Sequence, residues 1–371
     1  NAEMADAHHR LLESIRSISE QRYPRWRLYV PDCVLTDHAS REWVERIVAR
    51  DERIQRVDGD AAEAVTAACA GSDGACDYVM FLRAGDRLGP NSLFHIANHC
   101  QIRADAEIIY GDDDVIDASG ERAAPNFKPQ WNLDLLLATN YVGHAVAFAK
   151  AQLLSRLAAL SGSRGVDLHR LLLELAAEVE PARIHHVPFV IYHNAAPNSA
   201  DGGQSTSRSL EAVSTYLKSV DPRAVVAPAG DKGYRITWSV PEPAPLVSLL
   251  VPTRDRVEIL RPCVDTLLAV TRYPNYEVII LDNGSTCAET LDYMKSIAQD
   301  PRVRVLRYDA PFNYSAINNY GVHHAQGSII GLVNNDIEPI NPDWLTEMVG
   351  HACRPDIGCV GAKLYYPNDT V

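Results

Sequence analysis

The sequence lacks several features that would assign it to common protein classes. No apolar stretch approaches the roughly 20 residues of a membrane-spanning helix, and the polar N-terminus has no hydrophobic segment of a secretory signal. The formal net charge of −13 disfavours nonspecific binding to nucleic acid. None of the eight cysteines has the C-x-x-C spacing of a structural zinc site, so we expect reduced thiols and a cytoplasmic protein.

Short catalytic and phosphate-binding motifs are also missing. Without a G-x-S-x-G nucleophile elbow, hydrolase chemistry of that kind has little support. The absence of G-x-G-x-x-G and G-x-x-x-x-G-K-[ST] loops argues against dehydrogenases and P-loop NTPases. A phosphate ligand in so acidic a chain therefore needs a local site or a metal ion.

Three apolar runs in the C-terminal part of the chain each end in a polar turn. These pairs are 246–251 with Pro252-Thr253-Arg254-Asp255, 276–281 with Asp282-Asn283-Gly284, and 328–333 with Asn334-Asn335-Asp336. Short apolar runs of this kind, separated by helical patterns, indicate buried parallel strands of an α/β sheet. Ligands bind such sheets outside the carboxyl ends of the strands, which is where these polar turns lie.

The two halves of the chain share anchor residues at a constant offset of 250 positions. Arg22-Tyr23-Pro24 recurs as Arg272-Tyr273-Pro274, Asp32 falls on Asp282, and Asp86 falls on Asp336. Because each anchor lies at the end of a predicted strand or helix, we predict a tandem duplication. The first copy would occupy 1–240, a stiff Pro-rich linker 241–245, and about half of a second copy 246–371.

The polar turns, together with the segment from Asn313 to Gly321 (NYSAINNYG), resemble the family 2 glycosyltransferases of the GT-A fold in order and spacing. The resemblance covers all of 246–371 and is nearest to the rhamnosyltransferase-like enzymes of bacterial O-antigen and polysaccharide synthesis. The first copy resembles the same family through 127–129, 140–144 and 184–193. The expected fold is α/β, with two tandem GT-A (nucleotide-diphospho-sugar transferase, Rossmann-like) domains, each with a mostly parallel twisted sheet. The first domain would lack its first strand.

The resemblance implies a nucleotide site and a metal site in the second copy. Asp282 would accept a hydrogen bond from the base, and Gly284 would let the backbone approach the ligand closely. Further nucleotide contacts are expected from Pro252, Thr253, Asp255, Asn318 and Asn319. Asp336, with Asn334 at the first position of the family's D-x-D motif, would bind Mg²⁺ or Mn²⁺. The alternative for Asn334 to Asp336 is a turn cap without a metal.

The same positions are degenerate in the first copy. Its metal turn, 83–86, keeps Asp86 but adds Arg83, and Gly165 stands where relatives carry a catalytic acid. His193 either matches a histidine that completes the metal shell in relatives or is a strand-end histidine bonded to the backbone. We interpret the acidic run 112–114 as a solvated turn cap, with a metal cluster as the alternative.

The sequence thus predicts a metal-dependent, inverting glycosyltransferase. It would move a sugar from a nucleotide-sugar donor to a glycan or lipid-linked acceptor in bacterial surface polysaccharide synthesis. We expect no nucleic-acid partner, and peripheral membrane contact stays open because the acceptor can be lipid-linked. The catalytic base is expected beyond Val371, so this chain would bind the donor with weak or absent transfer.

Two alternatives remain. One is a non-catalytic, degenerate transferase module that acts as a scaffold or binds nucleotide or acceptor. The other is a nucleotidyltransferase, which is less favoured because no Gly-rich basic loop follows the first strand of the second copy.

Overall fold

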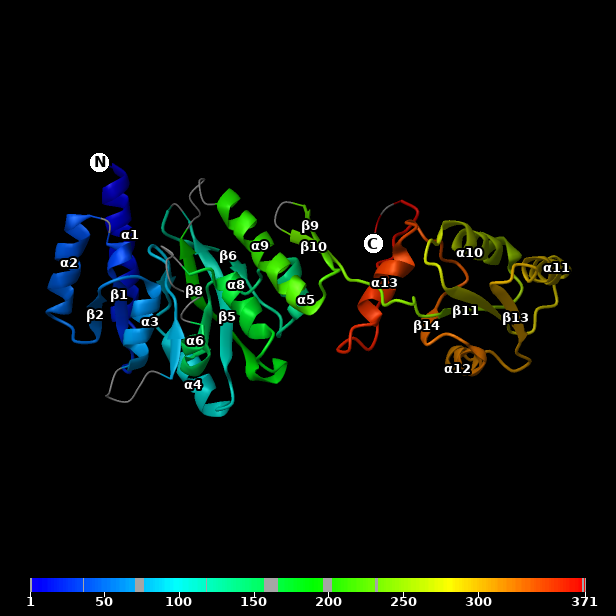
Figure 1. The fold of residues 1–371 in the computed structure, drawn as a ribbon, viewed down its shortest axis with the longest axis horizontal. Coiled ribbons are helices and arrows are strands. Elements are labelled where there is room, and N and C mark those ends of the chain that lie inside the picture. The colour runs from blue at the N-terminus through cyan, green and yellow to red at the C-terminus, as the bar shows by residue number, and fades with distance from the viewer. Residues whose placement is uncertain are drawn as a thin grey trace. The chain divides into compact units, whose positions relative to one another are not determined.

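The computed structural model describes residues 2–35, 37–70, 77–117, 119–156, 166–195, 202–230, 233–368 and 370. The chain divides into two compact units (Figure 1). Unit 1 comprises Asn1–Pro222 and Val226–Ile236, and unit 2 comprises Arg223–Val225 and Thr237–Val371. The predicted domain limits at 240 and 246 stay a prediction. No helix in the described ranges is long and apolar enough to cross a membrane.

Unit 1 contains most of the helices and two sheets of different size. Its elements are α1 (Ala2–Ser19), β1 (Leu28–Pro31), α2 (His38–Val48), β2 (Ile54–Val57), α3 (Ala61–Ala70), β3 (Tyr78–Met80), β4 (Arg87–Leu88), α4 (Ser92–Ile102), β5 (Ile108–Ile116), β6 (Arg122–Asn126), α5 (Leu133–Ala138), β7 (Val146–Ala149), α6 (Lys150–Leu154), α8 (Leu168–Ala176), β8 (Ile184–Ala195) and α9 (Gly202–Val220), with short 3₁₀ turns at Asp32–Val34 and Pro181–Arg183. Two further strands, β9 (Val225–Ala229) and β10 (Gly233–Thr237), pair where the units divide.

The larger sheet of unit 1 has the order β3-β7-β5-β8-β4, with β6 paired to β5. β5 runs parallel to β8, whereas it runs antiparallel to β6 and β7. The small sheet consists of β1 and β2, which pair in parallel. β5 lies at the centre, and seven of its nine residues are buried. This strand therefore forms the middle of the unit 1 core.

The acidic run 112–114 lies inside β5 and is buried, so the interpretation as a solvated turn cap is wrong. Basic side chains, most of them from distant segments, compensate the desolvation of the three carboxylates. Asp112 is paired with His186 at 2.7 Å, Asp113 with Lys128 at 2.7 Å, and Asp114 with both His193 at 2.5 Å and Arg122 at 2.6 Å. The run is thus a buried ion-pair network within the sheet.

Unit 2 is a single parallel sheet with helices on both faces. Its elements are β11 (Val247–Thr253), α10 (Val257–Val270), β12 (Tyr276–Asp282), α11 (Ala288–Ile297), β13 (Val303–Arg307), α12 (Tyr314–His324), β14 (Ile329–Leu332) and α13 (Trp344–Ala352). The strand order is β13-β12-β11-β14, and the pairs are parallel. The parallel strands predicted from the apolar runs are confirmed.

Alternate residues of β11 and β12 face two separate apolar layers. Leu249 and Val278 pack with the buried residues of α10, α11 and α13, whereas Leu250 and Ile279 pack with Ile317 of α12. Figure 1 accordingly shows α10 and α12 on opposite sides of the sheet. Burial on both faces explains why these strands are continuous apolar runs in the sequence.

The two units repeat a set of local contacts, at or within one residue of the predicted offset. An ion pair within a turn joins Asp51 to Arg53 in unit 1 and Asp300 to Arg302 in unit 2. The same arginines lie over aromatic rings, Arg53 over Trp26 and Arg302 over Tyr276. A further ion pair follows a strand in each unit, Asp32 with Arg56 and Asp282 with Arg307. These matching contacts support the tandem duplication, which stays a hypothesis.

A backbone contact at Gly327 offers a test of how tightly β14 approaches β11. A Cβ atom at Gly327 would lie 2.6 Å from the Leu246 carbonyl oxygen and 2.7 Å from the Ser248 nitrogen. We expect Gly327→Ala to lower the free energy of unfolding of unit 2 by about 1–3 kcal/mol, because backbone atoms have to move apart. Thermal unfolding followed by circular dichroism measures this effect. The matched control is Gly358→Ala, where a Cβ meets nothing within 4 Å; equal midpoints for the two variants would contradict the prediction.

Candidate functional site

The three polar turns of unit 2 meet at one edge of the sheet. β11 lies between β12 and β14, and Thr253 at its end is in register with Asp282. Backbone hydrogen bonds extend this alignment beyond the strands, from Asn283 N–H to the Thr253 carbonyl at 2.8 Å and from Val333 N–H to the Leu250 carbonyl at 2.9 Å. The Asn335 side chain also donates to the Thr253 hydroxyl at 3.1 Å. The predicted convergence of the strand ends is therefore present.

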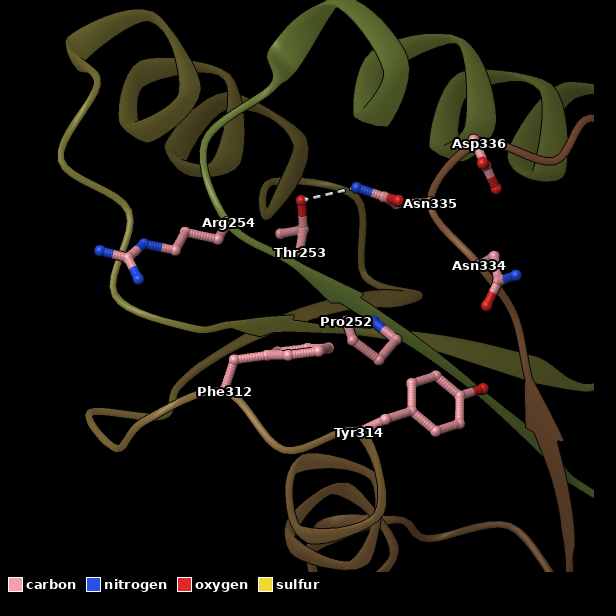
Figure 2. Close-up of a pocket in the computed structure, with 8 residues that line it drawn as sticks. All are labelled: Pro252, Thr253, Arg254, Phe312, Tyr314, Asn334, Asn335 and Asp336. Carbon is pink, nitrogen blue, oxygen red and sulfur yellow. Dashed lines mark hydrogen bonds between the residues drawn. The ribbon is translucent and has the colours of Figure 1, made fainter.

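A pocket of about 240 Å³ opens at this edge (Figure 2). Its lining residues are Pro252, Thr253, Arg254, Phe312, Tyr314, Asn334, Asn335 and Asp336. Pockets for small molecules usually measure roughly 300–1,000 Å³, so this one is small. It brings together four of the predicted site residues, Pro252, Thr253, Asn334 and Asp336. No individual role was predicted for the other four.

Asp336 and Asn334 are the exposed polar side chains of the pocket wall that follows β14. Within the described ranges neither side chain makes a hydrogen bond or an ion pair, so the turn-cap alternative finds no supporting contact. A carboxylate and a carboxamide oxygen are hard ligands of the type that Mg²⁺ and Mn²⁺ accept, with phosphate and water oxygens completing the shell. No group of three or more candidate ligands occurs in the described part of the chain. The residues present thus fit a cation that is shared with a phosphate ligand.

Cys263 of α10 lies directly beneath this turn. Its thiol is buried and donates to the Asn334 carbonyl at 3.5 Å. Burial raises the pKa of Cys263 to about 11, and the nearby negative charge of Asp336 acts in the same direction. The thiol therefore stays protonated near neutral pH and does not compete as a metal ligand. The seven cysteines that the structure describes are free, as predicted; Cys76 lies outside the described residues.

Asp282 organises the turn that follows β12 from a buried position. Its carboxylate accepts the Ser285 N–H at 2.8 Å and pairs with Arg307 at 2.7 Å. Gly284 adopts a φ of +79°, a left-handed conformation that favours glycine, so the turn itself requires this residue. Neither residue is among those that line the pocket. Their assignment to the nucleotide stays a prediction.

Asp255 binds the backbone of the two residues that precede α11. One of its carboxylate oxygens accepts the N–H groups of Cys287 at 2.7 Å and Thr286 at 2.8 Å. These two backbone donors hold the pKa of Asp255 below its ordinary value. The carboxylate thus joins two turns of the site and does not line the pocket.

Asn318 and Asn319 lie one turn into α12. The Asn318 side chain is buried and donates to the Tyr314 carbonyl at 2.8 Å, while its oxygen has no hydrogen-bond partner in the described structure. Asn319 is exposed on the helix. Neither residue lines the pocket, and both assignments stay predictions.

The turn at 83–86 of unit 1 is the predicted counterpart of the Asp336 turn, and its carboxylate is engaged within the protein. Asp86 is fully buried and paired with Arg83 at 3.1 Å; it also accepts the Tyr192 hydroxyl at 2.6 Å and the Ala195 N–H at 2.8 Å. The His193 ring is hydrogen-bonded to the Asp114 carboxylate. The sequence had predicted either a metal ion or the backbone as its partner. Gly165 lies outside the described residues.

Residues 248–371 match the family described as Glycosyl transferase family 2. Across nearly its whole length the chain is 37% identical to an uncharacterized protein, y4gI, of Sinorhizobium fredii, covering 97% of this chain and 41% of that protein. It is 36% identical to the O-antigen biosynthesis protein RfbC of Myxococcus xanthus, covering 97% of this chain and 29% of RfbC. Over 127 residues the chain is 30% identical to the putative colanic acid biosynthesis glycosyl transferase WcaA of Escherichia coli, covering 34% of this chain and 43% of WcaA. The chain thus spans less than half the length of these relatives.

The hydrogen bonds of Asp255 to the backbone before α11 predict a specific dependence of stability on pH. Because the pKa of Asp255 in the folded protein lies below its ordinary value of 3.8, its contribution to stability is complete above that value. The contribution is lost as the pH falls through the folded-state pKa. We therefore expect the difference in thermal midpoint between the wild type and Asp255→Asn to be constant above pH 5 and to shrink below pH 4. Melting curves between pH 2.5 and pH 7 measure it, and a difference that grows on acidification would refute the assignment.

Proposed function

We propose, because residues 248–371 match the Glycosyl transferase family 2 model, that unit 2 binds a nucleotide-diphosphate sugar together with a divalent cation. The observation that carries the proposal is the pocket at the strand ends, where Asp336 and Asn334 are exposed without a protein partner in the described ranges. In a chain with a net charge of −13, a diphosphate needs compensating positive charge, and the pocket lining itself supplies one cationic side chain, Arg254. Mg²⁺ or Mn²⁺ meets this need.

Each of the predicted site residues then has a role in donor binding. Asp336 and Asn334 would hold the cation, which supplies Lewis-acid stabilisation of the departing diphosphate when bound. Pro252 and Thr253 line the nucleotide, and Asp282 receives the base. Asp255 and Gly284 fix the turns around the site, and we assign Asn318 and Asn319 of α12 to the nucleotide. The pocket lining contains one carboxylate, and we assign it to the cation, which leaves the general base of an inverting transfer unassigned.

We further propose transfer to a glycan or lipid-linked acceptor in bacterial surface polysaccharide synthesis, on the cytoplasmic side. The names of RfbC and WcaA, which refer to O-antigen and colanic acid biosynthesis, support this context. A lipid-linked acceptor would bring the protein into peripheral contact with a membrane.

Replacement of Asp336 by alanine tests the cation site. We expect the Kd for the nucleotide that binds the wild type best among UDP, GDP and dTDP, measured by calorimetry with Mn²⁺, to rise at least roughly 10-fold, because one charged ligand of the cation is lost. Asn334→Ala should weaken binding less, since a neutral ligand is removed. The matched control is Asp292→Asn, at an exposed acid on α11 outside the pocket. Equal affinity with and without Mn²⁺ in the wild type would disprove the metal-dependent site.

A second candidate function concerns unit 1, which we propose is a non-catalytic module that serves as a scaffold or binds the acceptor. This role is favoured because the Asp86 carboxylate is fully buried and already accepts hydrogen bonds from Arg83, Tyr192 and the Ala195 N–H. Arg83 supplies the positive charge that a cation would otherwise bring. A carboxylate engaged in this way is a structural group.

The two acids at equivalent positions should therefore respond in opposite ways to replacement. Asp86→Ala leaves the buried Tyr192 hydroxyl and the half-buried Ala195 N–H without their acceptor, so we expect a loss of about 1–3 kcal/mol in the free energy of unfolding and no change in nucleotide affinity. Asp336→Ala should lose affinity and keep its stability. Denaturant unfolding and calorimetry on both variants provide the comparison. Loss of nucleotide binding in a stable Asp86→Ala protein would instead identify a donor site in unit 1.

A further inference from the structure

The pocket of unit 2 has an apolar wall that the proposed cation and Asp282 do not use. Pro252, Phe312 and Tyr314 form this wall, and Figure 2 shows Phe312 on the side of Pro252 away from Asn334 and Asp336. The Phe312 side chain is 64% exposed, and the Tyr314 side chain is 45% exposed. Large aromatic residues are usually buried, so two exposed rings at one pocket indicate a surface for a ligand.

The segment that carries Phe312 is fixed at both of its ends. The side-chain amide of Asn283 donates to the backbone carbonyl groups of Tyr308 at 3.1 Å and Ala310 at 2.8 Å. On the other side of Phe312, Asn313 caps α12 by accepting the Ala316 N–H at 2.9 Å. Asn283 is itself buried in the turn after β12, next to Asp282. The position of the Phe312 ring is therefore coupled to this turn.

We propose that the base of the bound nucleotide stacks on the ring of Phe312, and that Asn283 is the positioning residue that holds this ring in place. The proposal rests on the donor binding proposed above and assigns one part of the donor to one part of the pocket.

The sheet order favours the base over the phosphates at this end. β12 and β14 flank β11 on opposite sides, so the Asn283 turn and the Asp336 turn are separated by two strand spacings, about 10 Å. The diphosphate has to lie with the cation at Asp336. The other end of a nucleotide is a planar base, and a base–aromatic contact suits an apolar ring that phosphates would avoid.

Stacking on a ring does not distinguish one base from another, because every base has a π-face. The contribution of Phe312 should therefore be similar for UDP, GDP and dTDP, whereas discrimination between them would depend on hydrogen-bonding groups such as Asp282. Phe312 is thus expected to set the affinity, and the preference among bases is expected to survive its removal.

Calorimetric titration of three Phe312 variants and one control variant, in the presence of Mn²⁺, tests the proposal. We expect Phe312→Ala and Phe312→Leu to raise the Kd of each nucleotide that binds the wild type by roughly 5- to 150-fold, and Phe312→Trp to retain the affinity within about threefold. The matched control is Phe94→Ala, at a 51% exposed phenylalanine on α4 of unit 1. The indole added by Phe312→Trp should be quenched by a nucleotide and not by inorganic diphosphate, beyond the response of the wild-type tryptophans.

A double-mutant cycle tests the positioning role of Asn283. Asn283→Ala should raise the Kd in the wild-type background and have little further effect in the Phe312→Ala background, because both changes remove the same contact. Additive effects would contradict the coupling.

An unchanged Kd for Phe312→Ala, with normal binding by the wild type, would overturn the stacking proposal alone. Equal quenching by inorganic diphosphate would overturn it as well, because the ring would then face the phosphates. Absence of nucleotide binding to the wild type would instead contradict the proposed function itself.

Discussion

β11 pairs in parallel with β12 on one side and with β14 on the other, and its hydrogen bonds continue past the ends of the strands. Parallel strands end at the same edge of a sheet, so this pairing brings three turns that are distant in the sequence to one place. Side-chain hydrogen bonds then join the turns to one another. Asn335 donates to the Thr253 hydroxyl, Asp255 accepts a backbone N–H just before α11, and Asn283 donates to a backbone carbonyl in the loop before α12. The site depends on the register of β11, because each of these contacts starts from a strand end that the register positions.

The sequence was sufficient for the fold of unit 2 and for the edge at which the site forms. Apolar runs closed by polar turns are typical of buried parallel strands, which must be apolar on both faces. It was not sufficient for the direction of individual side chains. Asp255 and Asp282 occupy predicted positions, yet their carboxylates bind backbone N–H groups and Arg307 beside the pocket. Whether an acid at a strand end faces a ligand or a neighbouring turn depends on donors that another part of the chain supplies.

Two features had no local signal that could reveal them. Three consecutive acids normally indicate a solvated turn, but the run 112–114 is buried because Lys128, His186 and His193 come to it from other segments. Phe312 stands in an irregular loop without hydrophobic periodicity, so nothing near it in the sequence indicates that its ring faces a pocket. The offset of 250 residues did have a signal in the sequence, since it aligns Asp86 with Asp336 from their positions alone.

The contrast between these two acids shows what separates a candidate site from a structural element at the end of a strand. A carboxylate enclosed by protein has to find its donors within the protein, since an unpaired buried charge is too costly to keep. Asp86 meets that requirement with Arg83, Tyr192 and a backbone N–H, and once it does so its capacity to bind an external cation is spent. Asp336 stays exposed, with its solvation supplied by water, so a cation and a phosphate can replace that water at small cost. In this chain the presence of an acid at the strand end is therefore a weaker indication of binding chemistry than the absence of protein donors around it.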